Sequence, residues 1–130
     1  MTRGFEAIAQ GLSDAGVDTL FGVMGAGNLE VIPHWVHGVG GRYVAARHES
    51  AATAMAYGYA TVSGRIGACT VTHGPGVTNA LTALTTAVRA GSRLLLLTGE
   101  VSPAARRAHN QRLDHRAALA ASGVTMVDVE

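Results

Sequence analysis

The sequence predicts an α/β fold: a doubly wound, mainly parallel sheet with helices on both faces. Two observations lead to this prediction. Short runs of consecutive apolar residues, such as Leu94–Leu97, alternate along the chain with longer segments in which apolar residues have helical spacing. Runs that are apolar throughout are typical of parallel strands covered on both faces. With 130 residues and no internal repeat, the chain is expected to form a single domain, residues 1–130.

The first half of the chain begins with a predicted helix. Phe5, Ile8, Ala9 and Leu12 have helical spacing, and Gly16 follows as a stop. After it we expect a strand over 19–24, a short helix over 29–36, a strand over 43–46 and a helix over 49–62. Pro33 leaves the boundary of the short helix open.

The second half continues the alternation. We expect a strand over 66–72, a helix over 77–90, a strand over 94–97, an Ala-rich helix from Arg116 and a strand over 124–129. In the loop 73–76, two glycines flank a proline and make a rigid turn, after which Thr78 or Gly76 can cap the helix. The last strand has no helix after it, so the domain is expected to be incomplete at its C-terminus.

Composition excludes several function classes. Hydrophobic residues make up 48% of the chain, charged residues 15%, and the net charge is +1. Without a basic run, neither nucleic acid nor an anionic membrane surface is an expected partner. No apolar segment reaches the length of a membrane span. The single Cys69 and the absence of a signal peptide favour a cytoplasmic location.

Glu49 is the most informative single residue. It begins an Ala-rich helix with almost no other charge, directly after an apparent strand. The free N–H groups of a helix N-terminus favour a carboxylate, whereas desolvation among apolar neighbours opposes its charged form. A carboxyl group under two such opposed influences suits proton exchange in an enzyme. The alternative is an ordinary Glu in the first turn of a helix.

Three loops follow predicted strands, at the edge where open parallel sheets bind ligands: 25–28, the segment before Glu49, and 72–81. The first resembles part of a dinucleotide fingerprint, but Glu30 occupies the third glycine position, so a nicotinamide or flavin site has weak support. His34 with His37, or Cys69 with His73, lack the further ligands of a metal site. We assign Met24, Met55 and Tyr57 to the core. Arg106 and Arg107 are expected on a solvated loop.

Taken together, five segments resemble the N-terminal, pyrimidine-binding domain of thiamine-diphosphate-dependent enzymes, in the superfamily of acetolactate synthase, pyruvate oxidase and benzoylformate decarboxylase. The segments are Leu20–Asn28, Arg47–Ala60, Thr72–Leu84, Leu95–Glu100 and the Gln-x-x-Asp spacing of Gln111 to Asp114. They occur in family order over nearly the whole chain. The resemblance implies the thiamine-diphosphate-binding fold.

The resemblance also implies site residues. The family glutamate that corresponds to Glu49 hydrogen-bonds N1′ of the cofactor's aminopyrimidine and promotes the tautomer that deprotonates the thiazolium C2, which then attacks a 2-oxo acid. By motif matching, Gln111 would reach the reaction centre. The residues that would line the aminopyrimidine are Gly25, Thr72, Pro75, Gly76 and Asn79.

Two positions depart from the acetolactate synthase pattern. His73 replaces a small or hydroxyl residue, and it could serve as a proton shuttle or as a structural loop residue. Asn110 replaces an aromatic residue that commonly precedes the glutamine, which puts a standard acetolactate synthase pocket in doubt. An acetolactate synthase-like carboligase, a decarboxylase and an oxidase all stay open.

The family's Gly-Asp-Gly motif, which holds the diphosphate through Mg²⁺ in a separate domain, does not occur in this sequence. We therefore expect a lyase or transferase that is active only as part of a larger assembly, and an isolated chain that is inactive. A homodimer, a tetramer or a separate diphosphate-binding chain would supply the other half of the site. The alternative is a non-catalytic assembly or regulatory module that retains the same fold.

Overall fold

The computed structural model describes residues 2–102, 104 and 109–129; Arg106 and Arg107 lie outside the described residues. Its centre is a sheet of four parallel strands in the order β2-β1-β3-β4. The strands are β1 (Thr19–Gly22), β2 (Arg42–Ala45), β3 (Gly67–Val71) and β4 (Leu94–Thr98). The predicted parallel sheet is confirmed.

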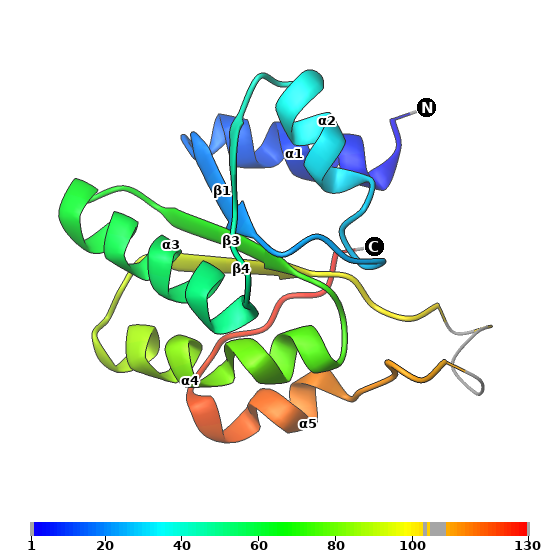
Figure 1. Ribbon diagram of the computed structural model, residues 1–130, viewed down its shortest axis with the longest axis vertical. Coiled ribbons are helices and arrows are strands. Elements are labelled where there is room, and N and C mark those ends of the chain that lie inside the picture. Colours follow the sequence, from blue (N-terminus) through cyan, green and yellow to red (C-terminus); the bar gives the residue numbers. More distant parts are fainter. Residues whose placement is uncertain (1, 103, 105–108, 130) are drawn as a thin grey trace.

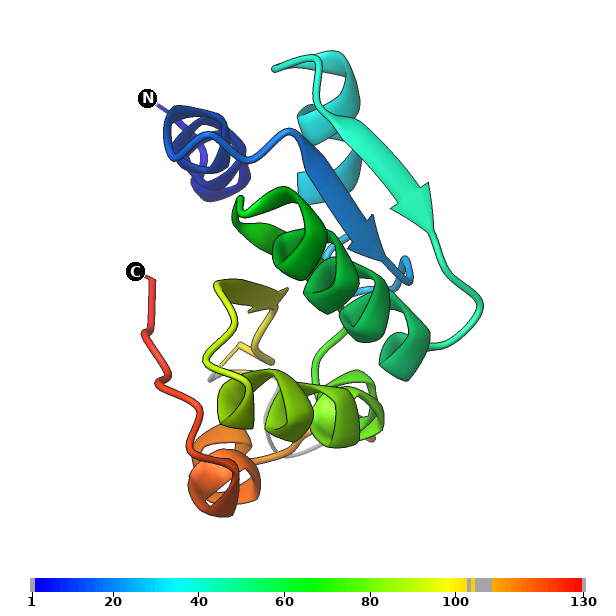
Figure 2. The same cartoon turned by 90° about the vertical axis from the view of Figure 1, so that its left-hand side faces the viewer.

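Helices cover both faces of this sheet, as expected for a doubly wound fold (Figures 1 and 2). They are α1 (Gly4–Asp14), α2 (Val31–His37), α3 (Glu49–Ser63), α4 (Pro75–Arg89) and α5 (His115–Leu119), with a 3-10 turn over Ala120–Ser122. The helices α1 and α2 lie on one face, and α3 and α4 pack side by side on the other. Within the described part of the chain, no helix is long and apolar enough to cross a membrane.

The core follows the two-residue period of the strands. Leu20 of β1 and Ala68 of β3 are buried against α1 and α2, whereas their neighbours Phe21 and Cys69 are buried against α3. The two inner strands, β1 and β3, are therefore buried along their whole length, whereas the outer strands β2 and β4 are partly exposed. Trp35 of α2 is 1% exposed and anchors the first face.

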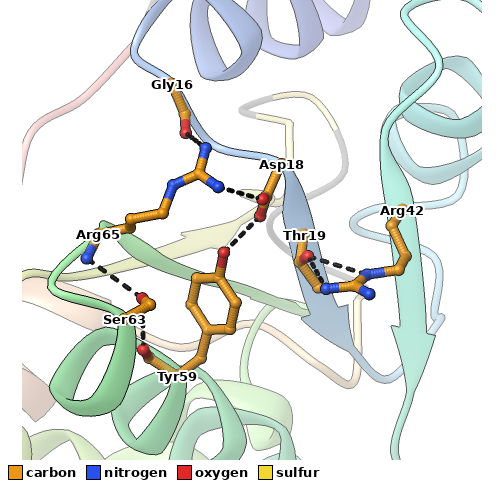
Figure 3. Close-up of polar contacts among 7 residues, drawn as sticks. All are labelled: Gly16, Asp18, Thr19, Arg42, Tyr59, Ser63 and Arg65. Carbon is orange, nitrogen blue, oxygen red and sulfur yellow. Dashed lines mark hydrogen bonds and ion pairs between the residues drawn. The ribbon is translucent and has the colours of Figure 1, made fainter.

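The C-terminal part of α3 is fastened to the start of β1 by a polar network (Figure 3). The Tyr59 hydroxyl donates a hydrogen bond of 2.7 Å to Asp18. Arg65 forms an ion pair with the same carboxylate and donates to the Gly16 carbonyl oxygen at 3.0 Å. Ser63 donates to the Tyr59 carbonyl oxygen at 2.6 Å. These contacts fix the helix whose other end carries Glu49.

The predicted strand over 124–129 is wrong. This segment has no strand structure and runs from α5 back toward β4 (Figure 1). Val124 and Met126 pack against the cluster of α4 and β3 side chains, whereas Val127 and Val129 are 77% and 76% exposed. The alternation of apolar residues therefore reflects one-sided packing without backbone pairing to a neighbouring strand.

The start of α4 also differs from the prediction. Neither Thr78 nor Gly76 caps this helix; Gly74 is the N-cap and Pro75 is the first helical residue. Proline suits this position because its fixed φ matches a helix and the first turn needs no N–H donor. Gly74 has φ +65°, a conformation that favours glycine. Pro33 lies inside the first turn of α2, where it is tolerated for the same reason.

The assignment of Met24 and Met55 to the core is also wrong. Met24, after β1, is 49% exposed, and Met55, on α3, is 37% exposed. Tyr57 is half-buried. The outward face of α3 therefore carries solvent-exposed apolar side chains, a pattern that local sequence does not distinguish from core packing.

Candidate functional site

The candidate site lies at the carboxyl ends of β1 and β3. From β1 the chain crosses to β2 on one side, whereas β3 lies on the other side of β1, so the loops that leave β1 and β3 diverge. Open parallel sheets bind ligands in the crevice that such a reversal creates. The loop Val23–Asn28, the loop Thr72–Gly74 and the start of α3 meet here.

Asn28 organises the first loop. Its side chain is 2% exposed, accepts a hydrogen bond from the Gly25 N–H at 2.8 Å, and donates to the Val23 carbonyl oxygen and to Thr70 Oγ1, both at 3.1 Å. Both N–H groups and the oxygen of the amide therefore take part in holding this loop against β3. The sequence reasoning included Asn28 in the loop but missed this role.

Thr72 joins the two loops. Its hydroxyl oxygen accepts a hydrogen bond from the Gly27 N–H at 3.1 Å. A Cβ atom at Gly25 would lie 2.7 Å from Thr72 Cβ, and one at Gly76 would lie 3.1 Å from Thr72 Cγ2. Glycine at these two positions therefore allows the loops and the start of α4 to approach Thr72 closely.

Glu49 is the first residue of α3, as predicted. The N-cap is His48, whose Nδ1 accepts a hydrogen bond from the Ser50 N–H at 3.2 Å. Thr53 Oγ1 donates to the Glu49 carbonyl oxygen at 2.9 Å. The carboxylate therefore lies among the free N–H groups of a helix N-terminus, where negative charge is favoured.

The Glu49 carboxylate is held on one side only. Asn79 Nδ2, on α4, donates to Glu49 Oε2 at 3.0 Å, and Ser50 Oγ donates to the Asn79 carbonyl oxygen. The other oxygen, Oε1, has no hydrogen-bond partner among the described residues, and the residue is half-buried. A Cβ atom at Gly76 would lie 3.7 Å from Oε1. The arrangement leaves one carboxylate oxygen able to share a proton with a ligand.

His73 directly follows Thr72, and a Cβ atom at Gly27 would lie 2.7 Å from its Nδ1. It is 6% exposed, its ring packs edge-on against His109 with 5.1 Å between centroids, and neither ring nitrogen has a hydrogen bond of standard geometry with a described residue. Burial lowers the pKa of His73, and the neighbouring His109 and His115 lower it further, while Glu100 and the Gln111 side chain act in the opposite direction. A lowered pKa favours the neutral form of the His73 ring.

Sequence reasoning missed His115. This residue opens α5, is 3% exposed, and accepts a hydrogen bond from the Gly74 N–H at its Nε2, at 2.8 Å. Asp114 caps the helix by accepting from the Ala117 N–H at 2.9 Å. The sequence signal was Asp114, an N-cap residue that places His115 in the first turn. The burial of His115 follows only from the docking of α5 beside α4.

The predicted residues thus form two groups. In the first group, Asn79 and Gly76 lie next to the Glu49 carboxylate, Thr72 lies next to Gly76, and Gly25 lies next to Thr72. The second group, His73 and Gln111, lies around Gly74: a Cβ atom at Gly74 would be 2.0 Å from the Gln111 carbonyl oxygen. Pro75 links the groups and is exposed at the start of α4. Among the described residues, no set of three or more His, Cys, Asp or Glu side chains is arranged to hold a metal ion.

Comparison with known proteins agrees with this architecture. Residues 2–126 match the family model described as thiamine pyrophosphate enzyme, N-terminal TPP binding domain. The chain is 41% identical over 103 residues to an acetolactate synthase isozyme 3 large subunit of Escherichia coli, covering 78% of this chain and 18% of that protein. It is 39% identical over 99 residues to an acetolactate synthase large subunit of Haemophilus influenzae, covering 75% of this chain and 17% of that protein.

A third relative is named as a probable decarboxylase. The chain is 48% identical over 84 residues to a probable 2-ketoarginine decarboxylase of Pseudomonas aeruginosa, covering 65% of this chain and 15% of that protein. The chain therefore spans less than a fifth of the length of these relatives. Since the family model covers nearly all of the sequence, the chain belongs to the family of N-terminal thiamine pyrophosphate-binding domains of thiamine pyrophosphate enzymes.

Proposed function

We propose that this chain supplies the aminopyrimidine-binding half of a thiamine diphosphate site in an enzyme that processes 2-oxo acids, either an acetolactate synthase-like carboligase or a decarboxylase. The proposal draws on relatives named as acetolactate synthases and as a probable 2-ketoarginine decarboxylase. The observation that carries it is the Glu49 carboxylate, with Oε2 held by Asn79 and Oε1 unpartnered among the described residues.

The residues of the first group fit the flat, nitrogen-containing ring of this cofactor. Oε1 of Glu49 would share a proton with the ring nitrogen, while Asn79 keeps the carboxylate in place. The small space at Gly76, which a Cβ atom would partly fill, leaves room beside Oε1. Gly25, Thr72 and Pro75 would line the same space. When bound, the cofactor supplies an acidic carbon and an electron sink, and the protein supplies orientation and proton exchange.

The other half of the site would come from elsewhere. Mg²⁺ and the diphosphate need hard oxygen ligands, which we assign to a second domain, a second copy in a homodimer or tetramer, or a separate chain. The outward face of α3 supports such a partner because it is uncharged and solvent-exposed beside Glu49. The residues of this face are Ala51, Ala54, Met55, Gly58, Thr61 and Val62. The cytoplasm suits this assembly, since Cys69 is a free, buried thiol.

His73 and Gln111 are assigned a secondary role near the reaction centre. The His73 ring, whose nitrogens have no hydrogen bond of standard geometry with a described residue, could accept or relay a proton once a ligand or partner is present. Neither residue makes a hydrogen bond to Glu49 among the described contacts. Their action on a substrate would therefore be separate from the action of Glu49 on the cofactor.

The test compares Glu49→Gln with the exposed Glu30→Gln as a matched control, each in the chain combined with its diphosphate-binding half. Binding of thiamine diphosphate in the presence and absence of Mg²⁺ is measured by calorimetry, and exchange of the cofactor C2 proton with deuterium by NMR. We expect Glu49→Gln to slow exchange by about 10²- to 10⁴-fold, the usual range for a general acid or base. The control should exchange like the unmodified protein.

Equal exchange rates in Glu49→Gln and in the unmodified assembly would contradict the assigned role of Glu49. An assembly that binds no thiamine diphosphate with or without Mg²⁺ would instead support a non-catalytic module with this fold. Product analysis with pyruvate, with and without a second 2-oxo acid, separates carboligation from decarboxylation.

A further inference from the structure

We propose that His115 is a positioning residue for the turn that begins α4, because its unprotonated Nε2 accepts a hydrogen bond from the Gly74 N–H. Protonation of Nε2 would break this hydrogen bond and free the Gly74 backbone to change conformation. The hydrogen bond and its loss on protonation concern this chain alone. The consequence for Glu49 rests on the proposed function described above.

The hydrogen bond defines the chemical state of the His115 ring. Gly74 is buried and its N–H can only donate, so the nitrogen facing it at 2.8 Å must carry a lone pair. The proton of the neutral ring is then on Nδ1, the atom that lies 3.9 Å from Glu100 Oε2. A ring protonated at both nitrogens would present a donor to the Gly74 donor, and the hydrogen bond would be lost.

The turn is held from two directions by the same C-terminal segment. The Gln111 carbonyl group fills the space where a Cβ atom at Gly74 would be, at 2.0 Å, and His115 bonds the Gly74 N–H. Gly74 has φ +65° and ψ −112°, far from the preferred regions of other residues. Because the backbone has wide conformational freedom at a glycine, the outside hydrogen bond selects this one conformation.

The first turn of α4 connects Gly74 to the Glu49 carboxylate. The Gly74 carbonyl oxygen accepts from the N–H groups of Val77 and Thr78, at 3.0 and 3.3 Å. The next residue, Asn79, donates to Glu49 Oε2 at 3.0 Å. A change in the Gly74 conformation would therefore move the residue that holds the Glu49 carboxylate.

Charged and titratable groups surround His115 unequally. Glu100, after β4, places Oε2 3.9 Å from His115 Nδ1, and the Asp114 carboxylate already accepts from the Ala117 N–H. The His73 ring lies near both His109 and His115, since each of them lowers the pKa of His73. The only charged residue of α4 is Arg89, at its opposite end. Protonation of His115 would therefore act at the turn itself.

The experiment uses NMR of the 130-residue chain without cofactor. Nitrogen-15 labelling detects the coupling between the Gly74 amide nitrogen and His115 Nε2 that passes through their hydrogen bond. Amide exchange reports the protection of Gly74. His115→Phe keeps a buried ring without an acceptor, His115→Gln offers an amide oxygen that does not titrate, and the exposed His37→Phe is the matched control.

We expect the coupling at neutral pH and its loss on acidification. After correction for intrinsic exchange, the Gly74 amide should exchange about tenfold faster in His115→Phe, a factor that corresponds to the net contribution of one hydrogen bond. His115→Gln should restore protection and remove its dependence on pH, and His37→Phe should change neither. The coupling and the Gly74 protection can also be measured in the unmodified chain and in His115→Gln, so the inference can be tested even if His115→Phe does not fold.

A proton on Nε2 at neutral pH, or unchanged Gly74 protection in a folded His115→Phe, would overturn the inference. A second measurement addresses the link to Glu49: in the loaded assembly, C2-proton exchange should slow in His115→Phe and recover in His115→Gln. Normal exchange in His115→Phe would refute that link. The cofactor-free NMR result is independent of whether Glu49 activates the cofactor, so the two proposals can fail separately.

Discussion

Gly67, the first residue of β3, allows α3 to lie directly against the sheet. A Cβ atom at this position would lie 2.0 Å from the Ala56 carbonyl oxygen and 3.1 Å from Ala60 Cβ. Carbon and carbonyl oxygen atoms ordinarily approach to about 3.3 Å, so Gly67→Ala must move α3 away from β3 by roughly 1.3 Å. The obstacle is backbone, which cannot change rotamer to make room.

The cost of this displacement can be estimated. Overpacking a core typically costs about 1–3 kcal/mol, and a clash with backbone places Gly67→Ala near the upper end. Replacing glycine also lowers the entropy of the unfolded chain, which returns about 0.4–1 kcal/mol. The net loss in the free energy of unfolding is therefore about 2 kcal/mol, equivalent to a melting temperature roughly 8 °C lower for a domain of this size.

Gly58→Ala is the matched control, because Gly58 lies inside α3 with no atom within 4 Å of an added Cβ. Alanine in a helix interior is about 1 kcal/mol more favourable than glycine, so this variant should be more stable. Urea unfolding followed by circular dichroism measures both. If Gly67→Ala were as stable as the unmodified chain, the close contact between α3 and β3 would not exist as described.

The remaining predictions concern two titratable groups. The Tyr59 hydroxyl lowers the pKa of Asp18; Thr19 and Arg65 act in the same direction, and burial acts against them. The ionised Asp18 therefore stabilises the fold fully above its unfolded pKa of about 3.9. This stabilisation is lost as the pH falls through the lower pKa of the folded state. Urea midpoints between pH 6 and pH 2 should fall less steeply in Asp18→Asn, and an unchanged slope would contradict this account. Burial raises the pKa of Cys69 to about 12, so a thiol reagent at pH 8 should react only when urea unfolds the chain; rapid reaction of the folded chain would contradict its burial.

Much of the fold was predictable because it depends on local patterns. Apolar strands such as Leu94–Thr98 and the glycine stop after α1 depend on residues close in sequence. The beginning of α3 at Glu49 was predictable because a charged residue interrupts a small, apolar run there. The position of the loops at one edge then follows from the parallel sheet. The chemical role of Glu49 stays a prediction.

The errors arose where contacts between distant segments decide the outcome. Alternating apolar residues over 124–129 predicted a strand, but periodicity cannot indicate whether a neighbouring strand is available for pairing. Met55 has an apolar side chain typical of a core residue, yet it lies on the outward face of α3. His115 was overlooked because its burial depends on the Gly74 turn, which is far away in the sequence.

The strand order β2-β1-β3-β4 also determines when the chain can fold during synthesis. Leu20 pairs with Ala68, so β1 obtains its second neighbour only after β3 has emerged from the ribosome. Each pairing in the sheet closes a long loop, and contacts between distant residues form slowly. Until then, the apolar strand β1 has an open edge that could pair with another nascent chain. Once β3 has emerged, its own second edge stays open until β4 follows, so we expect this domain to depend on chaperones until β4 is complete.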